Sequence, residues 1–238
     1  MLTDLPQPRG IAARLADAAL SMGSEPNFAA TLEAIVREAQ KSIPGTDHAG
    51  LSLIVDGKIE TAAPTSPLVE QIDEYQYKFG EGPCVDAIFE AEVYRTGDMS
   101  AEHRWPDFST AAADAGVASM LAFRLHLDGR TQGALNLYSS QHDAFDDAAV
   151  HTGQPFAAHA AIALAHSREK LQLLDALDSR DVIGMAKGII MQKYCIDDER
   201  AFSVLVALSQ HGQEKLRDVA GHIVEECRAE ARDSLPKS

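Results

Sequence analysis

Three helical patterns follow one another between residues 171 and 224 with almost no loop between them. The first carries leucine, methionine and isoleucine at steps of three, four or seven residues, as an amphipathic helix requires. Asp197 or Asp198 offers an N-cap to a second helix, which ends near Gly212, and a third begins about Gln213. The apolar face of the second helix is expected to carry Ala201, Phe202, Leu205 and Leu208. Because such short helices are marginal alone, the stretch predicts a bundle of helices around a shared core.

Two glycines, Gly184 and Gly188, lie four residues apart inside the first of these helices. Each costs about 0.5–1 kcal/mol relative to alanine in a helix interior. The spacing places both on one face, which predicts that something approaches this face too closely for a side chain. Close packing of another helix is favoured over direct contact with a ligand. Lys187 points to another face and is free to meet solvent or an anion.

The three predicted helices carry the motifs SRDVIGMAKGIIM, DERAFSVL and SQxxxxKLRDVA in this order. Together these motifs resemble the ANTAR domain, a family named for two bacterial transcription antitermination regulators. The resemblance implies a three-helix RNA-binding module, dimerised through the helix that enters it. It also implies binding to leader RNA with paired small stem-loops, which stops a terminator hairpin from forming. The basic positions of the family, carried over one at a time, give four candidate RNA-binding residues: Arg180, Lys187, Lys215 and Arg217.

The chain departs from the usual ANTAR pattern at three positions. Gln213 and Glu214 stand in a turn where the family often has Asn and a basic residue, and Val206 stands where Arg is frequent. Gln is a poorer N-cap than Asn, and Glu214 places negative charge where a phosphate would come. These departures are expected to weaken RNA binding or to change the class of hairpin that is recognised.

The net charge of −15 counts against general affinity for nucleic acids, because phosphate binding depends on Lys and Arg. The segment from Arg180 to Arg217 is nearly neutral, with six basic and five acidic side chains. If RNA is bound there, recognition of unpaired loop bases has to matter more than bulk attraction.

The chain before residue 166 has a different organisation. Helical patterns over 9–22 and 27–42 precede two segments of period two, 49–55 and 58–63, and the turn Asp56-Gly57 between them signals a hairpin. The remaining expected elements are helices over 67–77 and 85–90 and strands over 93–96, 119–127 and 133–139. This order predicts an α+β domain in which helices flank an antiparallel sheet.

Three motifs in this region, FGEGPCVDA, RWPDF and DGRTQGALNLY, resemble a GAF domain of the kind found ahead of ANTAR domains in actinobacteria. The resemblance implies a small-molecule sensor, but it names no particular ligand or cofactor. The expected order is an N-terminal helix (1–25), a GAF sensor-like domain (26–166), a helical connector (167–179) and an ANTAR domain (180–238). The chain is thus identified with GAF–ANTAR antitermination regulators: an α+β GAF domain, a long helix and an all-α three-helix bundle.

Few residues of the first domain are candidates for chemistry. Cys84 follows Gly-Pro at a helix start, which favours a lowered thiol pKa and a redox role, although a lone cysteine is more often a small buried hydrophobic residue. Trp105 is expected to pack over the sheet in a loop or to line a ligand pocket. No histidine spacing fits a metal or haem site, and no phosphate-binding glycine loop is present. No catalytic or metal site is therefore predicted.

No clear stop signal lies between Asp147 and Cys195, so the last helix of the first domain is expected to continue into the bundle. Leu164, Leu171 and Leu174 form an incomplete heptad seam and are the candidate dimerisation residues. No apolar run is long enough for a membrane helix, and no signal-peptide pattern begins the chain. A cytoplasmic homodimer is expected, in which a signal in the GAF domain changes helix pairing and the spacing of two RNA-binding bundles.

The leading functional hypothesis is a non-enzymatic, RNA-binding regulator of transcription termination. Three alternatives stay open. The second and third helices could bind duplex DNA as a helix-turn-helix. Cys84 could serve a thiol-based GAF redox enzyme, such as a sulfoxide reductase. The bundle could act only in dimerisation and protein docking.

Overall fold

The computed structural model describes residues 11–233 and divides into two compact units, with the boundary between Glu169 and Lys170. Each unit has a hydrophobic core of its own. Residues 1–10 of the expected N-terminal helix (1–25) and residues 234–238 of the expected ANTAR domain (180–238) lie outside the described residues.

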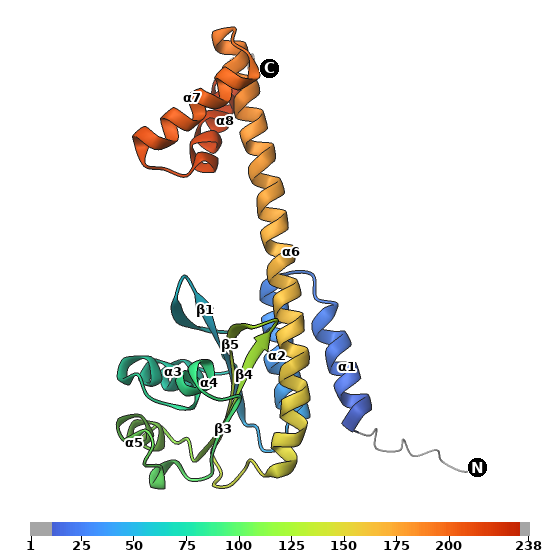
Figure 1. Cartoon of the computed structure of the whole chain (residues 1–238), viewed down its shortest axis with the longest axis vertical. Helices are drawn as coiled ribbons and strands as arrows, with labels where there is room; N and C mark the ends of the chain where they lie inside the picture. Colours follow the sequence, from blue (N-terminus) through green and yellow to red (C-terminus); the bar gives the residue numbers. More distant parts are fainter. Residues whose placement is uncertain (1–10, 234–238) are drawn as a thin grey trace, which may run out of the picture. The chain divides into compact units, whose positions relative to one another are not determined.

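The first unit is built on a five-stranded antiparallel sheet with the strand order β2-β1-β5-β4-β3 (Figure 1). Its strands are β1 (His48–Val55), β2 (Lys58–Ala62), β3 (Val93–Thr96), β4 (Ser119–Leu127) and β5 (Arg130–Ser139). Asp56-Gly57 and Asp128-Gly129 connect the two tight hairpins, and all four residues have positive φ. A type I′ turn requires this backbone conformation, so the hairpin signals in the sequence are confirmed.

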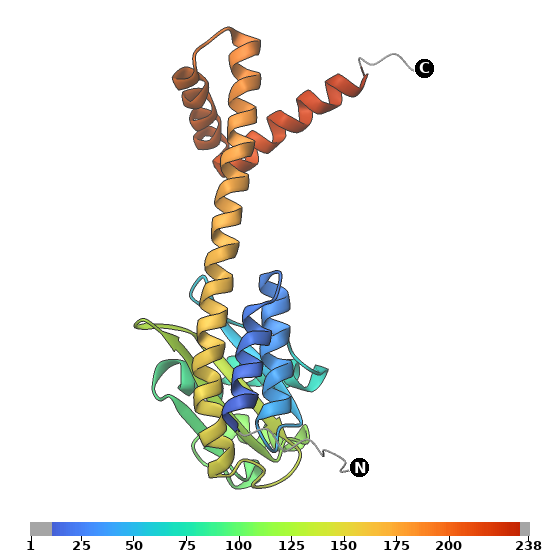
Figure 2. The same cartoon turned by 90° about the vertical axis from the view of Figure 1, so that its right-hand side faces the viewer.

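Helices cover both faces of this sheet. The helices α1 (Ile11–Gly23), α2 (Phe28–Ser42) and the first part of α6 (Asp147–Tyr194) lie side by side on one face (Figures 1 and 2). The other face carries α3 (Pro67–Phe79), α4 (Pro83–Phe89), the 3₁₀ turn η1 (Met99–Ala101) and α5 (Pro106–Asp114). Side chains alternate between the faces along each strand, so Leu121 and Phe123 join the core under α2 and α6 while Met120 joins the core under α3 and α5.

Side-chain caps fix where several helices begin. Asn27 Oδ1 accepts a hydrogen bond of 2.9 Å from the Ala30 N–H at the start of α2, and Asp146 caps α6 in the same way at the Ala149 N–H. Asp197 caps α7 (Asp198–Gly212) by accepting from the Arg200 N–H. These short polar side chains satisfy N–H groups that have no partner inside the helix.

The second unit consists of the end of α6 together with α7 and α8 (Leu216–Asp233). Helix α7 runs alongside the last turns of α6, and α8 crosses α6 (Figure 2). Its small core contains seven buried residues: Ala186, Ile190, Ala201, Leu205, Val219, Ala220 and Val224. The helix α6 is 48 residues long and has no break, which confirms the expected continuity between the first domain and the bundle. None of the described helices is long and apolar enough to cross a membrane.

Two features differ from the expected elements. Helix α5 follows Trp105 where no helix was expected, while Trp105 itself lies in the irregular segment just before that helix. The third bundle helix begins at Leu216 and not at Gln213. Gln213 adopts the left-handed conformation with φ 54° and its N–H donates to the Ser209 carbonyl, so it closes α7 and does not cap α8.

Candidate nucleic-acid interface

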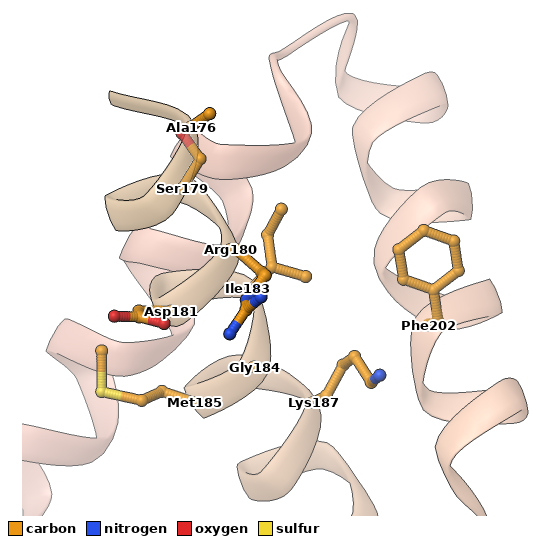
Figure 3. A pocket seen from close by; sticks show the side chains of 9 residues that line it. All are labelled: Ala176, Ser179, Arg180, Asp181, Ile183, Gly184, Met185, Lys187 and Phe202. Atoms are coloured by element: carbon orange, nitrogen blue, oxygen red, sulfur yellow. The ribbon is translucent and has the colours of Figure 1, made fainter. Parts of the chain in front are cut away.

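An open pocket of about 1070 Å³ lies on the bundle between α6 and α7. Two of the four candidate RNA-binding residues, Arg180 and Lys187, line it from α6 together with Gly184. Phe202 lines it from α7 (Figure 3). The structure therefore gathers two cations, one aromatic ring and a stretch of bare backbone in one place.

Lys187 is held between a carboxylate and an aromatic ring. Its Nζ lies 2.5 Å from Asp198 Oδ1 in the first turn of α7 and 5.9 Å from the centroid of the Phe202 ring. Figure 3 shows the side chain of Lys187 reaching from α6 toward Phe202. The ion pair partly neutralises the ammonium group, and the two contacts fix its position at the edge of the pocket.

Arg180 is exposed, and its side chain has no hydrogen bond or ion pair with any residue between 11 and 233. The side chain of Lys215 is likewise exposed and unpaired within this range, but it lies outside the pocket. Arg217 also lies outside the pocket, and its guanidinium donates to Asp175 and, over 2.7 Å, to Asp178 on α6. The four candidates thus do not form one cluster, and Arg180 is the free cation of the pocket.

The face that carries Gly184 and Gly188 is open. Both glycines are exposed, and a Cβ added to either would meet no heavy atom of the described chain within 4 Å. No helix of the described chain therefore packs against this face, and the expected packing of another helix stays a prediction. Gly184 instead leaves the backbone of α6 bare at the floor of the pocket.

Phe202 differs from its expected position in the bundle core. Ala201 and Leu205 are fully buried, whereas Phe202 and Leu208 are 43% and 46% exposed. Successive residues of a helix are about 100° apart, so Phe202 points well away from its buried neighbour Ala201. The spacing of Ala201 and Leu205, one helical turn apart, is the signal that could have placed Phe202 outside the core.

The candidate dimerisation residues occupy two different environments. Leu164 is fully buried in the core of the first unit, so it is not available to a second chain. The prediction that Leu164 belongs to the dimerisation seam is therefore wrong. Leu171 and Leu174 are about half exposed on the later part of α6. Leu173 and Leu177 are exposed beside them, which makes an apolar stretch of four leucines.

Cys84 is completely buried in the first turn of α4. Burial raises the pKa of its thiol to about 12, and the neighbouring carboxylate of Asp73 acts in the same direction. The pKa is thus raised and not lowered as a redox role would require, because burial disfavours the thiolate. The favoured interpretation of Cys84 as a small buried hydrophobic residue agrees with its burial.

Trp105 packs over the sheet face that carries α3 and α5. This agrees with the expectation that it packs over the sheet, and not with the expectation that it lines a ligand pocket. Its indole N–H donates to Asp86 Oδ2 over 2.7 Å, and its ring meets Tyr94 edge-on at 5.8 Å between centroids. The guanidinium of Arg104 lies 4.4 Å above the ring. These contacts use both the polar and the apolar parts of the side chain, which makes Trp105 a structural residue of the core.

A buried polar network under α3 has no counterpart among the expected site residues. The carboxylate of Asp73 accepts hydrogen bonds from Tyr138, from Thr61 over 2.9 Å and from Gln76 over 3.1 Å. Burial raises the pKa of Asp73 to about 6, although these hydrogen bonds act in the opposite direction. Asp73 and Gln76 recur with the buried Val69 and Ile72 at steps of three or four, so helical periodicity could have placed them inside.

The network continues toward Cys84. The Tyr77 hydroxyl lies 2.8 Å from Ser52 Oγ and 2.9 Å from Thr61 Oγ1, and Asn136 Nδ2 donates to Ser52 over 2.9 Å. The Gln76 side-chain oxygen accepts from the Cys84 N–H over 2.9 Å. Polar side chains of the chain itself therefore connect the sheet to the helices α3 and α4 through hydrogen bonds.

Two family models match the chain in sequence. Residues 25–165 match the GAF domain and residues 171–224 match the ANTAR domain. No curated protein sequence matches the chain.

Several solved structures share the fold of the first unit. Free methionine-R-sulfoxide reductase from Neisseria meningitidis, solved with its substrate, has a TM-score of 0.54 and 20% identity over 71% of this chain and 98% of its own. The GAF domain of an Acinetobacter phosphoenolpyruvate-protein phosphotransferase has a TM-score of 0.53 and 13% identity over 70% of this chain and 99% of its own. The GAF domain of a phosphoenolpyruvate-protein phosphotransferase from Coxiella burnetii has a TM-score of 0.52 and 19% identity over 67% of this chain and 95% of its own. At such identities the likeness establishes the fold alone.

The match to the GAF model spans more than half of the chain, and the ANTAR match follows it and covers the bundle. The order of the two domains is that of regulators of transcription antitermination that carry a sensing domain. The chain therefore belongs to the GAF domain family and has the architecture of a GAF–ANTAR regulator.

Proposed function

We propose that this protein is an RNA-binding antitermination regulator that binds paired stem-loops in nascent leader RNA and is gated by a signal sensed in its GAF domain. The observation that carries the proposal is the ANTAR match over residues 171–224, which includes the whole pocket-forming part of the bundle. The gathering of Arg180, Lys187 and Phe202 in one open pocket supports it independently of the sequence match.

The charges of the bundle favour selective binding over general attraction. Arg180 and Lys215 are free to meet phosphates, while Lys187 and Arg217 are engaged by carboxylates of the same unit. An RNA would have to displace Asp175 and Asp178 before Arg217 could contact it. Because only two of the four candidate cations are free, the bundle gains little from phosphate neutralisation at these positions, so it has to read the unpaired bases of a loop.

A homodimer fits this function, because paired stem-loops call for two binding bundles. The exposed leucines at 171, 173, 174 and 177 supply apolar surface for a second copy. Leu171 and Leu174 thus stay in the proposed seam, and Leu164 does not.

The helix α6 offers a route for gating. It contributes Leu164 to the core of the first unit and Ile190 to the core of the second, with no break between them. A small-molecule ligand or another signal that rearranges the first core would act on the same helix that holds the bundle together. The coupling is measured as a change in RNA affinity caused by the signal.

Capture of bound transcripts tests the proposal. Wild-type protein is compared with Arg180→Ala/Lys187→Ala and with a matched control, Lys58→Ala/Arg130→Ala. The control removes two exposed cations from the first residues of β2 and β5, next to the hairpin turns of the first unit. The expected result is enrichment of a leader RNA with paired stem-loops by the wild type and the control, and its loss in the first variant. Equal capture of unrelated RNA by all three proteins, or a preference for duplex DNA, would contradict it.

The structure gives no support to a thiol-based enzyme. Cys84 is fully buried, and its raised pKa keeps it protonated at neutral pH. A thiol nucleophile has to reach its substrate as the thiolate, so this residue is unsuited to the task.

A further inference from the structure

Phe202 is an aromatic side chain that the bundle leaves open to solvent. It lies next to Ala201 in the first half of α7, and it is 43% exposed although Ala201 is completely buried. Lys187 Nζ lies 5.9 Å from the centroid of its ring. A ring held beside a fixed ammonium group offers a flat surface of defined orientation.

The space beside the ring suits a flat ligand. The pocket has a volume of about 1070 Å³, and its wall on α6 contains Gly184, where no side chain projects. The Cβ position of Gly184 has no heavy atom of the described chain within 4 Å, so a planar group can approach the α6 backbone from this side. Ile183 adds apolar surface to the same wall (Figure 3).

The charges around the pocket are balanced but unevenly placed. Arg180 is exposed and unpaired among the described residues, whereas Lys187 is bound to Asp198. Asp181 also lines the pocket, but Figure 3 shows it on the opposite side of α6 from Phe202, next to Met185. One guanidinium is therefore available for a phosphate beside a surface that is otherwise aromatic and apolar.

We propose that Phe202 is a stacking platform for one unpaired nucleobase of the RNA loop, with Arg180 on the adjacent phosphate and Gly184 leaving room for the base. This inference rests on the proposed function and adds to it the group that reads the loop. Stacking on an aromatic face suits a surface of low net charge, because it binds a base without requiring many phosphate contacts. Lys187 then serves as a positioning residue that holds its ammonium beside the ring.

The test uses the full-length protein and the leader RNA recovered by transcript capture, with 2-aminopurine placed at one loop position at a time. The variants are Phe202→Ala, Phe202→Leu and Phe202→Trp, and Leu208→Ala is the matched control for an exposed apolar residue on the same helix. We expect wild type and Phe202→Trp to quench one loop position. We expect Phe202→Ala and Phe202→Leu to lose this quenching and to bind about 5- to 150-fold more weakly. Leu208→Ala keeps both.

Three outcomes would overturn the inference, and they separate it from the proposed function. If Phe202→Leu binds and quenches like the wild type while Arg180→Ala/Lys187→Ala loses the RNA, the protein binds RNA without the stacking platform. If Phe202→Leu changes the oligomeric state measured by light scattering and no loop position is ever quenched, the ring belongs to a contact between two copies. If the wild type captures no leader RNA, the result contradicts both the proposed function and the stacking role of Phe202. Phe202→Leu retains an apolar side chain, so a folding defect of Phe202→Ala does not decide the test.

Discussion

The buried carboxylate of Asp73 makes the stability of the first unit depend on pH. In the folded protein its pKa is raised from the ordinary value of 3.8 to about 6, because burial disfavours the charged form. Each pKa unit corresponds to about 1.36 kcal/mol, so this rise corresponds to about 3 kcal/mol. A group whose pKa is raised on folding stabilises the fold fully below the unfolded pKa and loses this contribution as pH rises through the folded pKa. The stabilisation from Asp73 therefore disappears between about pH 4 and pH 6.

The isosteric substitution Asp73→Asn removes this titration while it keeps the shape of the side chain. We expect the free energy of unfolding of the variant, relative to the wild type, to rise by about 2–2.5 kcal/mol between pH 4 and pH 7, because a small part of the total is already lost at pH 4. The absolute values also contain changes in the hydrogen bonds from Tyr138 and Thr61, but these changes are common to all pH values. The quantity to compare is thus the difference between the two proteins as a function of pH.

Urea denaturation between pH 4 and pH 8, followed by tryptophan fluorescence, measures this difference. Trp105 is the only tryptophan of the chain and is buried in the first unit, so its signal reports on the unit that contains Asp73. Asp128→Asn, in the exposed turn between β4 and β5, controls for the loss of one negative charge. A difference between Asp73→Asn and wild type that stays constant from pH 4 to pH 7 would refute the reasoning.

Three further predictions follow from local contacts. In native protein two thiols should react quickly with an aromatic disulfide reagent and Cys84 only after unfolding, because two cysteines are exposed and Cys84 is buried; three fast thiols would contradict this. Asp198→Asn should strengthen binding of the captured leader RNA by a few-fold, because it removes a carboxylate from the edge of the pocket while Phe202 still lies beside the ammonium group of Lys187. The ion pair that is lost is worth about 0.2–1 kcal/mol, and an unchanged or weaker affinity in a filter-binding titration would count against this reasoning. Gly184→Ala should leave the melting temperature of the bundle unchanged or raise it, because the added methyl group meets no other atom of the described chain. Gly153→Ala should lower the melting temperature of the first unit, because its methyl group would clash with the ring of Phe123. Thermal scans by circular dichroism that place the two variants in the reverse order would refute this.

The elements of the fold could be predicted where single residues determine the local backbone, as turn and cap residues do. Asp56-Gly57 marks a hairpin because both residues must take positive φ, and Asp197 marks a helix start because its carboxylate binds an N–H of the first turn. The sequence does not predict helix α5, because this helix is short and rich in alanine and so carries little hydrophobic periodicity. The sequence places Gln213 at the start of the third bundle helix and not at the end of α7, because a residue other than glycine or asparagine rarely closes a helix in the left-handed conformation.

The candidate site could be predicted only in part, because exposure depends on packing between elements. The sequence identifies Lys187 as a basic residue beside the glycine face, but its contacts with Asp198 and Phe202 depend on how α7 folds back on α6. Phe202 looks like a core residue from composition, and only the burial of Ala201 and Leu205 places it outside. Leu164 follows the same leucine pattern as Leu171, yet only the packing of the first unit separates them.

The boundary between the two domains falls inside an unbroken helix, and this restricts how such a chain can evolve. In most multidomain proteins an insertion between domains only lengthens a loop. Here one inserted residue would turn everything that follows by about 100° and advance it by about 1.5 Å. Only insertions close to whole turns, such as seven or eleven residues, would keep a sensor and a bundle in the same rotational phase. In related proteins with these two domains, the length of this segment is therefore expected to change only by amounts close to whole helical turns, even where its residues change freely.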